Sequence, residues 1–197
     1  KEHRQINAGG LIGYCYNHFT IDGCTNNMSY VYNCDKTTTH YYGGLYGRMY
    51  QTYPYETTSS TSNSVGTVKL WFNVKDFTNN SDATLNVTSE KTLYASKLIG
   101  SAEGPTLFLK LGKVTCDGDL TITKKGASAT YTGLKVGGIN AYMNSGENTL
   151  YDTSEATIAI NGNLTVTGLT PDASATTNIG GAVGSFTKDL SNITVNG

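Results

Sequence analysis

The chain has 197 residues, and its 14 Lys and Arg nearly balance its 15 Asp and Glu, for a formal net charge of −1. Nucleic-acid grooves and polybasic membrane surfaces both need clustered cations, so this balance argues against both classes of partner. Only 15% of the residues are charged, whereas Thr, Asn, Ser and Gly number 30, 18, 15 and 23. Thr, Val, Ile and Tyr favour strands while Gly and Asn favour turns, so the composition predicts an all-β protein.

A phrase of two glycines followed by an apolar residue recurs along the chain. It occurs at Gly9–Gly13, Gly43–Gly47, Gly137–Asn140 and Gly180–Gly184, with a degenerate copy at Lys97–Ser101. The copies lie 34, 53, 40 and 44 residues apart when they are aligned on Ile12, Tyr46, Ile99, Ile139 and Val183. A recurrence of this kind is typical of a repeat protein, here with degenerate repeats of about 40 residues.

Short strands and one loop are expected between these phrases. Residues 53–66 form a polar run that predicts an exposed loop inserted on one repeat. Alternating apolar and polar residues predict strands at Val68–Val74, Ala83–Thr88, Leu120–Thr123 and Leu164–Thr167. A second phrase, Cys116–Thr123, matches Ile160–Thr167 with a shift of 44 residues, and Thr20–Thr25 and Ser191–Gly197 echo it. No stretch has the apolar period of an amphipathic helix.

The repeat length suits a β-solenoid or a β-propeller. Propeller blades carry a Trp-Asp signature, but Trp71 is the only tryptophan and no Asp follows it. An immunoglobulin-like sandwich would not explain the recurring Gly-Gly phrase. We therefore predict one domain over residues 1–197, a parallel β-solenoid for which the right-handed form is the default. Each repeat is expected to make two coils of about 20 residues, and nine or ten coils would form a rod of about 45 Å.

The phrase Gly9–Gly13 followed by Thr20–Asn26, and Gly180–Gly184 followed by Ser191–Val195, resemble the GLUG-type repeat. This repeat reads Gly-Gly-Leu-Val-Gly, a spacer, Ile-x-Asn-Cys and an Asn-Gly-x-Val ending. The family occurs in large surface and secreted proteins of bacteria, including adhesins. The resemblance implies an extracellular or cell-surface segment of a longer chain, which serves adhesion or display rather than catalysis and needs no cofactor.

Tyrosines are concentrated in one part of the chain and are the candidate binding residues. Six of them fall within 15 positions: Tyr41, Tyr42, Tyr46, Tyr50, Tyr53 and Tyr55. A tyrosine offers a rigid apolar face and a hydroxyl, which suit contacts with carbohydrate and protein. The alternative is structural, with the rings capping one end of the solenoid or stacking as a ladder on its flank.

Three cysteines, Cys15, Cys24 and Cys34, lie within 20 residues and leave two interpretations open. One disulfide among them would fit an oxidising compartment, whereas buried reduced thiols would act as small hydrophobic side chains. Their spacing, with Cys116 far away, matches no zinc pattern, so no metal site is expected.

The other polar candidates favour structural roles. Asp117 and Asp119 occupy the positions of Asn161 and Asn163 in the matching phrase, so we interpret them as turn residues. A calcium site and a pair of glycosidase acids are the less favoured alternatives. The histidines, His3, His18 and His40, are expected on the surface or in loops. Thr-x-Thr pairs at Thr121/Thr123 and Thr165/Thr167 should stack in register, but they are too few to predict an ice-binding surface.

The leading hypothesis from the sequence is a non-enzymatic adhesive stalk or binding module. Its partner would be a host or microbial surface glycan or protein, or further copies of the chain, with no nucleic acid and no membrane span in this segment. The alternatives are a structural unit that assembles into filaments or a surface layer, and a carbohydrate-active β-helix enzyme.

Overall fold

The structure is a computed structural model that describes residues 5–15, 19–34, 38–50, 72–88, 91–104, 107–124, 133–145, 150–168, 176–185 and 191–196. Within these ranges it contains strands and turns but no helix, which confirms the all-β prediction. The strands form four sheets, and all neighbouring strands run parallel, as expected for a β-solenoid. The predicted 53–66 insertion lies outside the described residues.

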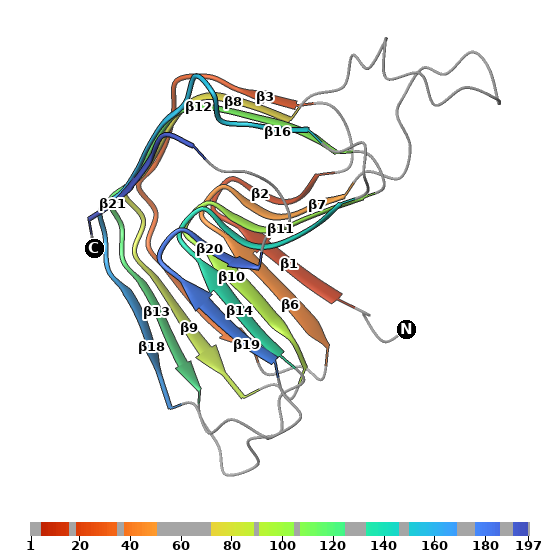
Figure 1. Cartoon of the computed structure of the whole chain (residues 1–197). Coiled ribbons are helices and arrows are strands. Elements are labelled where there is room, and N and C mark those ends of the chain that lie inside the picture. Colours follow the sequence, from red (N-terminus) through yellow and green to blue (C-terminus); the bar gives the residue numbers. More distant parts are fainter. Residues whose placement is uncertain are drawn as a thin grey trace, which may run out of the picture.

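The chain passes through the four sheets in the same order in every coil (Figure 1). Sheet A contains β1 (Gln5–Gly9), β6 (Thr39–Gly43), β10 (Leu93–Ser96), β14 (Gly133–Gly137) and β19 (Thr176–Gly180). Sheet B contains β2 (Ile12–Cys15), β7 (Tyr46–Tyr50), β11 (Ile99–Gly104), β15 (Asn140–Ser145) and β20 (Val183–Ser185). Sheet C contains β3 (Phe19–Ile21), β4 (Cys24–Asn26), β8 (Phe72–Asn79), β12 (Phe108–Cys116), β16 (Leu150–Asp152), β17 (Thr157–Ile160) and β21 (Ile193–Val195). Sheet D contains β5 (Tyr30–Cys34), β9 (Ala83–Val87), β13 (Leu120–Lys124) and β18 (Leu164–Thr167).

Each sequence repeat forms one coil, so the expectation of two coils per repeat was wrong. In sheet B the strand partners lie a whole repeat apart, since Ile12 pairs with Tyr46 and Tyr46 pairs with Ile99. One coil therefore uses strands from all four sheets. Four coils and part of a fifth, stacked at strand spacing, extend about 20 Å along the axis rather than the predicted 45 Å.

The predicted alignment of the fourth glycine phrase is also shifted by one residue. Ile99 pairs with Asn140, and Asn140 pairs with Val183, whereas the sequence alignment used Ile139. Asn140 is fully buried, and its side-chain oxygen accepts a hydrogen bond from the Tyr142 backbone at 3.0 Å. Matching by apolarity failed here because a polar residue occupies an inward position.

The 44-residue match between the second phrases is confirmed, since Cys116 pairs with Ile160 and Leu120 pairs with Leu164. The Ser191–Gly197 echo is confirmed in part: Val195 pairs with Ile160, and the Asn196 side chain donates to Asn161 at 2.8 Å. The Thr20–Thr25 echo is wrong, because Asn26 is the residue of the first coil that shares the column of Cys116.

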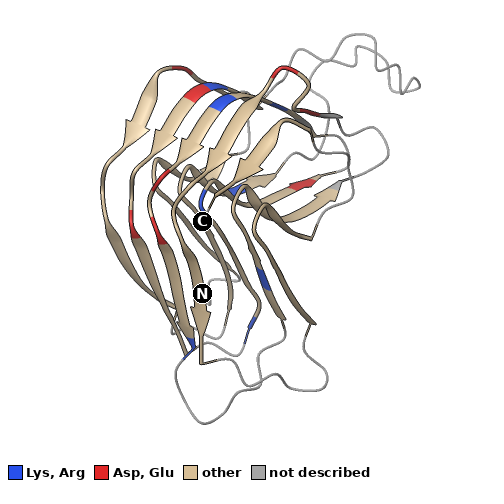
Figure 2. Ribbon diagram, turned by 60° about the vertical axis from the view of Figure 1, so that its left-hand side comes forward, with Lys and Arg blue, Asp and Glu red and all other residues tan. Residues whose placement is uncertain are grey.

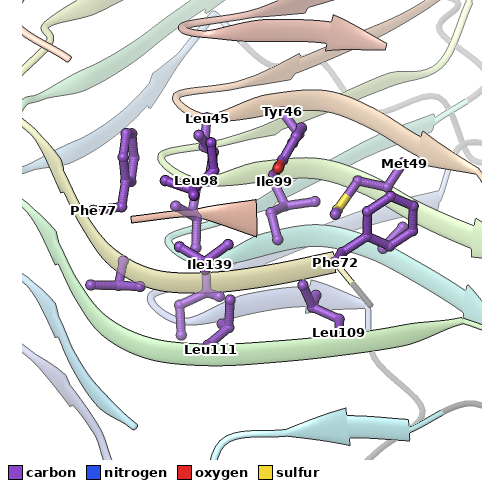
Figure 3. Packing of buried hydrophobic residues seen from close by; sticks show 14 of the residues in the cluster. Leu45, Tyr46, Met49, Phe72, Phe77, Leu98, Ile99, Leu109, Leu111 and Ile139 are labelled. Atoms are coloured by element: carbon purple, nitrogen blue, oxygen red, sulfur yellow. The ribbon is translucent and has the colours of Figure 1, made fainter. Parts of the chain in front are cut away.

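The coil has a V-shaped outline with two separate cores (Figure 1). Sheets B and C pack face to face in one arm, around a cluster that includes Tyr46, Met49, Phe72 and Leu109 (Figure 3). Sheets A and D pack in the other arm, around a second cluster: Cys34, Tyr42, Ala83, Leu85, Val87, Leu93, Ala95, Leu120, Ile122, Leu134 and Val136. Alternation along each strand sends the intervening side chains outward.

The two arms meet at a narrow waist, which explains the Gly-Gly phrase. On one side of the waist lie the turns from sheet A to sheet B, and on the other lies one column of sheet C residues: Asn26, Asn79, Cys116 and Ile160. A Cβ on Gly10 would lie 2.0 Å from the Gly44 carbonyl oxygen and 2.4 Å from the Asn26 amide nitrogen. Glycine is needed here because backbone and side chains approach too closely for any larger residue.

Buried amide side chains cross this waist. The Asn26 Nδ2 donates to the Asn79 Oδ1 at 3.0 Å and to the Gly44 carbonyl at 3.2 Å, and the Asn79 Nδ2 donates to the Lys97 carbonyl at 2.9 Å. Lys97 stands where the neighbouring coils have glycine, is 2% exposed, and donates from Nζ to the Gly162 carbonyl. The waist is therefore held by hydrogen bonds in the first three coils and by apolar Ile160 in the fourth.

Polar side chains stack between coils at the outer turn from sheet C to sheet D. The Asn80 amide donates to Asn27 at 2.8 Å, the Asn161 amide donates to Asp117 at 2.7 Å, and the Asn163 backbone N–H donates to Asp119 at 2.7 Å. Charged residues are otherwise sparse over the ribbon (Figure 2). The ladder satisfies polar groups that the turn would leave unpaired, so these residues act as turn residues.

Candidate binding site

The outward faces of sheets A and B look toward each other across the inside of the V (Figure 1). Two columns of side chains line this angle, and they consist of aromatic, polar and charged residues. Sheet A provides Asn7, Tyr41, Tyr94, Lys135 and Asn178. Sheet B provides Tyr14, Arg48, Ser101, Tyr142 and Ser185. Neither column contains an aliphatic side chain, which separates this face from both cores.

Three tyrosines from three coils form a stack in this angle. The ring centroids of Tyr41 and Tyr94 lie 4.9 Å apart with an interplanar angle of 11°, and those of Tyr94 and Tyr142 lie 5.0 Å apart at 27°. Tyr94 belongs to sheet A and Tyr142 to sheet B, so the stack bridges the two sheets. We call Tyr41, Tyr94, Tyr142, Arg48, Glu103 and Lys135 the tyrosine cluster.

An ion pair anchors one end of the tyrosine cluster. The Arg48 guanidinium donates from Nε and from one terminal nitrogen to the two carboxylate oxygens of Glu103, each at 3.1 Å. It also donates to the Gln5 side-chain oxygen at 2.5 Å and lies 4.9 Å from the ring centroids of both Tyr41 and Tyr50. The side chains of Arg48 and Glu103 are 13% and 17% exposed, so water screens this bidentate ion pair less than it would screen an exposed pair.

Lys135 provides the second cation of the tyrosine cluster. Its Nζ lies 3.7 Å from the Tyr142 ring centroid and 5.7 Å from that of Tyr94. Burial lowers the pKa of Lys135, and the Glu103 carboxylate partly opposes that shift. Among the described residues Lys135 forms no ion pair, so the cluster has two cations and one carboxylate, which is paired with Arg48.

The phenols of the tyrosine cluster stay protonated far into the alkaline range. Burial, reinforced by the Tyr142 phenol and the Glu103 carboxylate, raises the pKa of Tyr94 to about 12. Burial also raises the pKa of Tyr41 and that of Tyr142, and Glu103 adds to both shifts. The face therefore presents neutral phenols, which can donate as well as accept hydrogen bonds.

The four described tyrosines of the six proposed from the sequence divide between the two cores and the inside of the V. Tyr41 and Tyr50 face the inside of the V, where neighbouring side chains leave Tyr41 only 7% exposed. Tyr42 and Tyr46 point inward, are 3% and 0% exposed, and belong to the two cores. Tyr53 and Tyr55 lie outside the described residues. The Tyr41–Tyr94 pair matches the ladder interpretation, and no end cap is formed by Tyr42 or Tyr46.

Removing the Tyr46 hydroxyl is expected to stabilise the fold. None of the described residues hydrogen-bonds to that buried hydroxyl, so Tyr46→Phe should raise the free energy of unfolding by about 1 kcal/mol in a urea titration at pH 7.

The same variant should also resist alkali better than the wild type. Burial raises the pKa of Tyr46, so its contribution to stability is complete below about pH 10 and is lost as the pH rises toward the folded-state value. Tyr46→Phe should therefore show a shallower fall in the free energy of unfolding above pH 10. A variant less stable than wild type at pH 7 would contradict the unpaired hydroxyl.

The other candidates from the sequence do not join the tyrosine cluster. No disulfide joins any two of Cys15, Cys24, Cys34 and Cys116, and Cys34 belongs to a different core from Cys15. Among the described residues, no group of three or more His, Cys, Asp and Glu side chains could hold a metal ion. The threonine pairs stack on sheet D, where Thr121 and Thr123 pair with Thr165 and Thr167.

The expected position of His40 was wrong. It is fully buried, and its Nδ1 lies 3.1 Å from the Tyr32 hydroxyl. His40 occupies an inward position of β6, so it faces the core between sheets A and D rather than solvent. His3 and His18 lie outside the described residues.

Sequence reasoning missed Tyr94, Tyr142, Arg48 and Lys135. Tyr41 and Tyr94 are 53 residues apart, which is the spacing of Tyr46 and Ile99 in the glycine phrases. Extending the phrase alignment to flanking residues would have found this pair. Tyr142 would not have been found in this way, because its contact with Tyr94 joins two different sheets and depends on the angle of the V.

Comparison of the chain with protein-family models, with curated proteins and with solved structures finds no match. Within the described ranges, no helix has the length and apolarity that a membrane crossing would require.

Proposed function

We propose that this chain is a non-enzymatic binding module of a bacterial extracellular or cell-surface protein, related to GLUG-type repeats, and that the tyrosine cluster is its binding face. The observation that carries the proposal is the gathering of Tyr41, Tyr94, Tyr142 and two cations on one face from three coils. Aromatic rings with polar groups at their edges provide rigid contact area at small entropic cost, as in other recognition surfaces.

The carboxylates support a binding role over catalysis. Asp117 and Asp119 accept hydrogen bonds from Asn161 and Asn163 in the outer turn, where they replace asparagine. Glu103 is held by Arg48 and by the Ser101 hydroxyl at 2.5 Å. A glycosidase needs two acids flanking one bond, one of which must give up a proton. Each of these three carboxylates instead has a structural partner.

Retention on a panel of immobilised glycans and matrix proteins tests this proposal, with Tyr142→Ala as the diagnostic variant. Tyr142 is half-buried at the outer part of the stack, so its loss should weaken binding about tenfold while leaving the cores intact. Thr165→Ala, on the exposed face of sheet D, is the matched control and should bind like wild type. Absence of binding across the panel, or equal binding by the Tyr142→Ala protein, would overturn the proposal.

A further inference from the structure

The charge balance inside the V distinguishes Lys135 from the other charged residues that the structure describes there. Arg48 and Glu103 neutralise each other through two hydrogen bonds. Lys135 retains a positive charge that is partly desolvated and lies over an aromatic ring. A desolvated cation attracts an anion more strongly than an exposed one, because less water screens the interaction.

Side chains with hydroxyl and amide groups surround Lys135. Tyr94 and Tyr142 place phenol groups beside it, and Asn178 is its neighbour in the sheet A column. The next sheet A column toward the outer edge of the V contains Gln5, Thr39, Gly133 and Thr176. The amides and hydroxyls of these columns can form hydrogen bonds with a sugar chain, but the columns offer no aliphatic pocket for an apolar peptide side chain.

We propose that the tyrosine cluster recognises an acidic polysaccharide, with an anionic group of one sugar residue paired to Lys135 and the sugar ring lying against Tyr142. This inference rests on the proposed function and specifies its ligand class. The anion is a carboxylate of a uronic acid or a sulfate ester, which share the charge that Lys135 recognises. Neutral glycans of the same length lack the partner for Lys135 and bind more weakly.

The test compares four oligosaccharides by isothermal titration calorimetry on the full chain. Oligogalacturonate supplies carboxylates and a heparin-derived oligosaccharide supplies sulfates, while cellohexaose and a galactose oligomer are the neutral arms. The variants are Lys135→Gln and, as a matched control, Lys113→Gln, whose lysine is exposed on sheet C. Lys135→Gln is expected to weaken binding of the preferred acidic oligosaccharide about tenfold and to reduce its salt dependence. Lys113→Gln should change neither.

The outcomes separate this inference from the function on which it rests. Preferential binding of either acidic oligosaccharide, lost in Lys135→Gln, supports the inference, and the preferred arm identifies the carboxylate or the sulfate. Binding of a neutral oligosaccharide that Tyr142→Ala loses and Lys135→Gln retains overturns the acidic ligand but keeps the binding module. Binding of no glycan, with matrix-protein binding lost in Tyr142→Ala, overturns the polysaccharide class alone. No binding to any panel member overturns both proposals.

Discussion

Gly44→Ala is expected to destabilise the fold strongly. A Cβ at this position would lie 2.1 Å from the Lys97 carbonyl oxygen and 2.3 Å from the Asn79 amide nitrogen. Both atoms belong to the hydrogen bond that crosses the waist, so relief of the clash breaks that bond and separates the two arms. We expect the free energy of unfolding to fall by about 3 kcal/mol, measured by urea denaturation.

The same repeat position in the last coil provides the control. Gly181 follows Gly44 and Gly138 in this column, but among the described residues an added Cβ there would meet only the Val195 Cγ1 within 4 Å, at 3.2 Å. Gly181→Ala should therefore cost less than about 1 kcal/mol. Equal costs at Gly44 and Gly181 would show that backbone conformation, and not the close approach at the waist, selects glycine in the repeat.

The repeat and its strands were predictable because they depend on local patterns. Alternation at Leu120–Thr123 and Leu164–Thr167 predicts β13 and β18, and the structure pairs these strands directly. The Gly-Gly phrase predicts the repeat, and the close approach at the waist is the reason for its glycines. The number of coils was not predictable in the same way, since spacing alone cannot show how many strands each repeat places around the axis.

The candidate site was less predictable because it depends on register and on the angle between sheets. Tyr41 and Tyr42 are neighbours in sequence, yet strand alternation sends one ring to the tyrosine cluster and the other into the core. Local density of tyrosine therefore misplaced half of the described candidates, Tyr42 and Tyr46. Arg48 lies only two residues beyond Tyr46, and its importance follows from Glu103, a residue of the next coil.

The lysine at position 97 shows how the waist can adapt. Lys97 occupies the column of Gly44 and Gly138, and its opposing sheet C residue is Cys116. The thiol lies 3.8 Å from the Lys97 carbonyl and needs less room than an amide making two hydrogen bonds. Where asparagine faces the turn, as Asn79 does in the second coil, the turn position of that coil is a glycine, here Gly44. The two sides of the waist are thus matched in size within each coil.

Asn79→Ala is the second change with a large expected effect. Asn79 is 2% exposed, and its side chain accepts from Asn26, accepts from the Ser81 backbone at 3.4 Å and donates to the Lys97 carbonyl. Alanine leaves these groups unpaired in a dry interior and opens a small cavity. We expect a loss of about 3 kcal/mol in the free energy of unfolding, against less than about 0.5 kcal/mol for Asn80→Ala in the exposed ladder.

Asn79→Asp separates the lost hydrogen bonds from the lost volume. A carboxylate keeps the shape of the amide, but it places an oxygen against the Lys97 carbonyl, where Nδ2 donated at 2.9 Å. Only the protonated acid can restore that donor, so burial should raise the pKa of this carboxyl in the folded state. The variant should therefore be most stable below about pH 4 and lose stability, relative to wild type, as the pH rises through the folded-state pKa. Comparing urea denaturation of variant and wild type from pH 3 to pH 8 measures this difference. A constant difference across the range would mean that the waist admits water at Asn79, and that its amides contribute by packing rather than by hydrogen bonding.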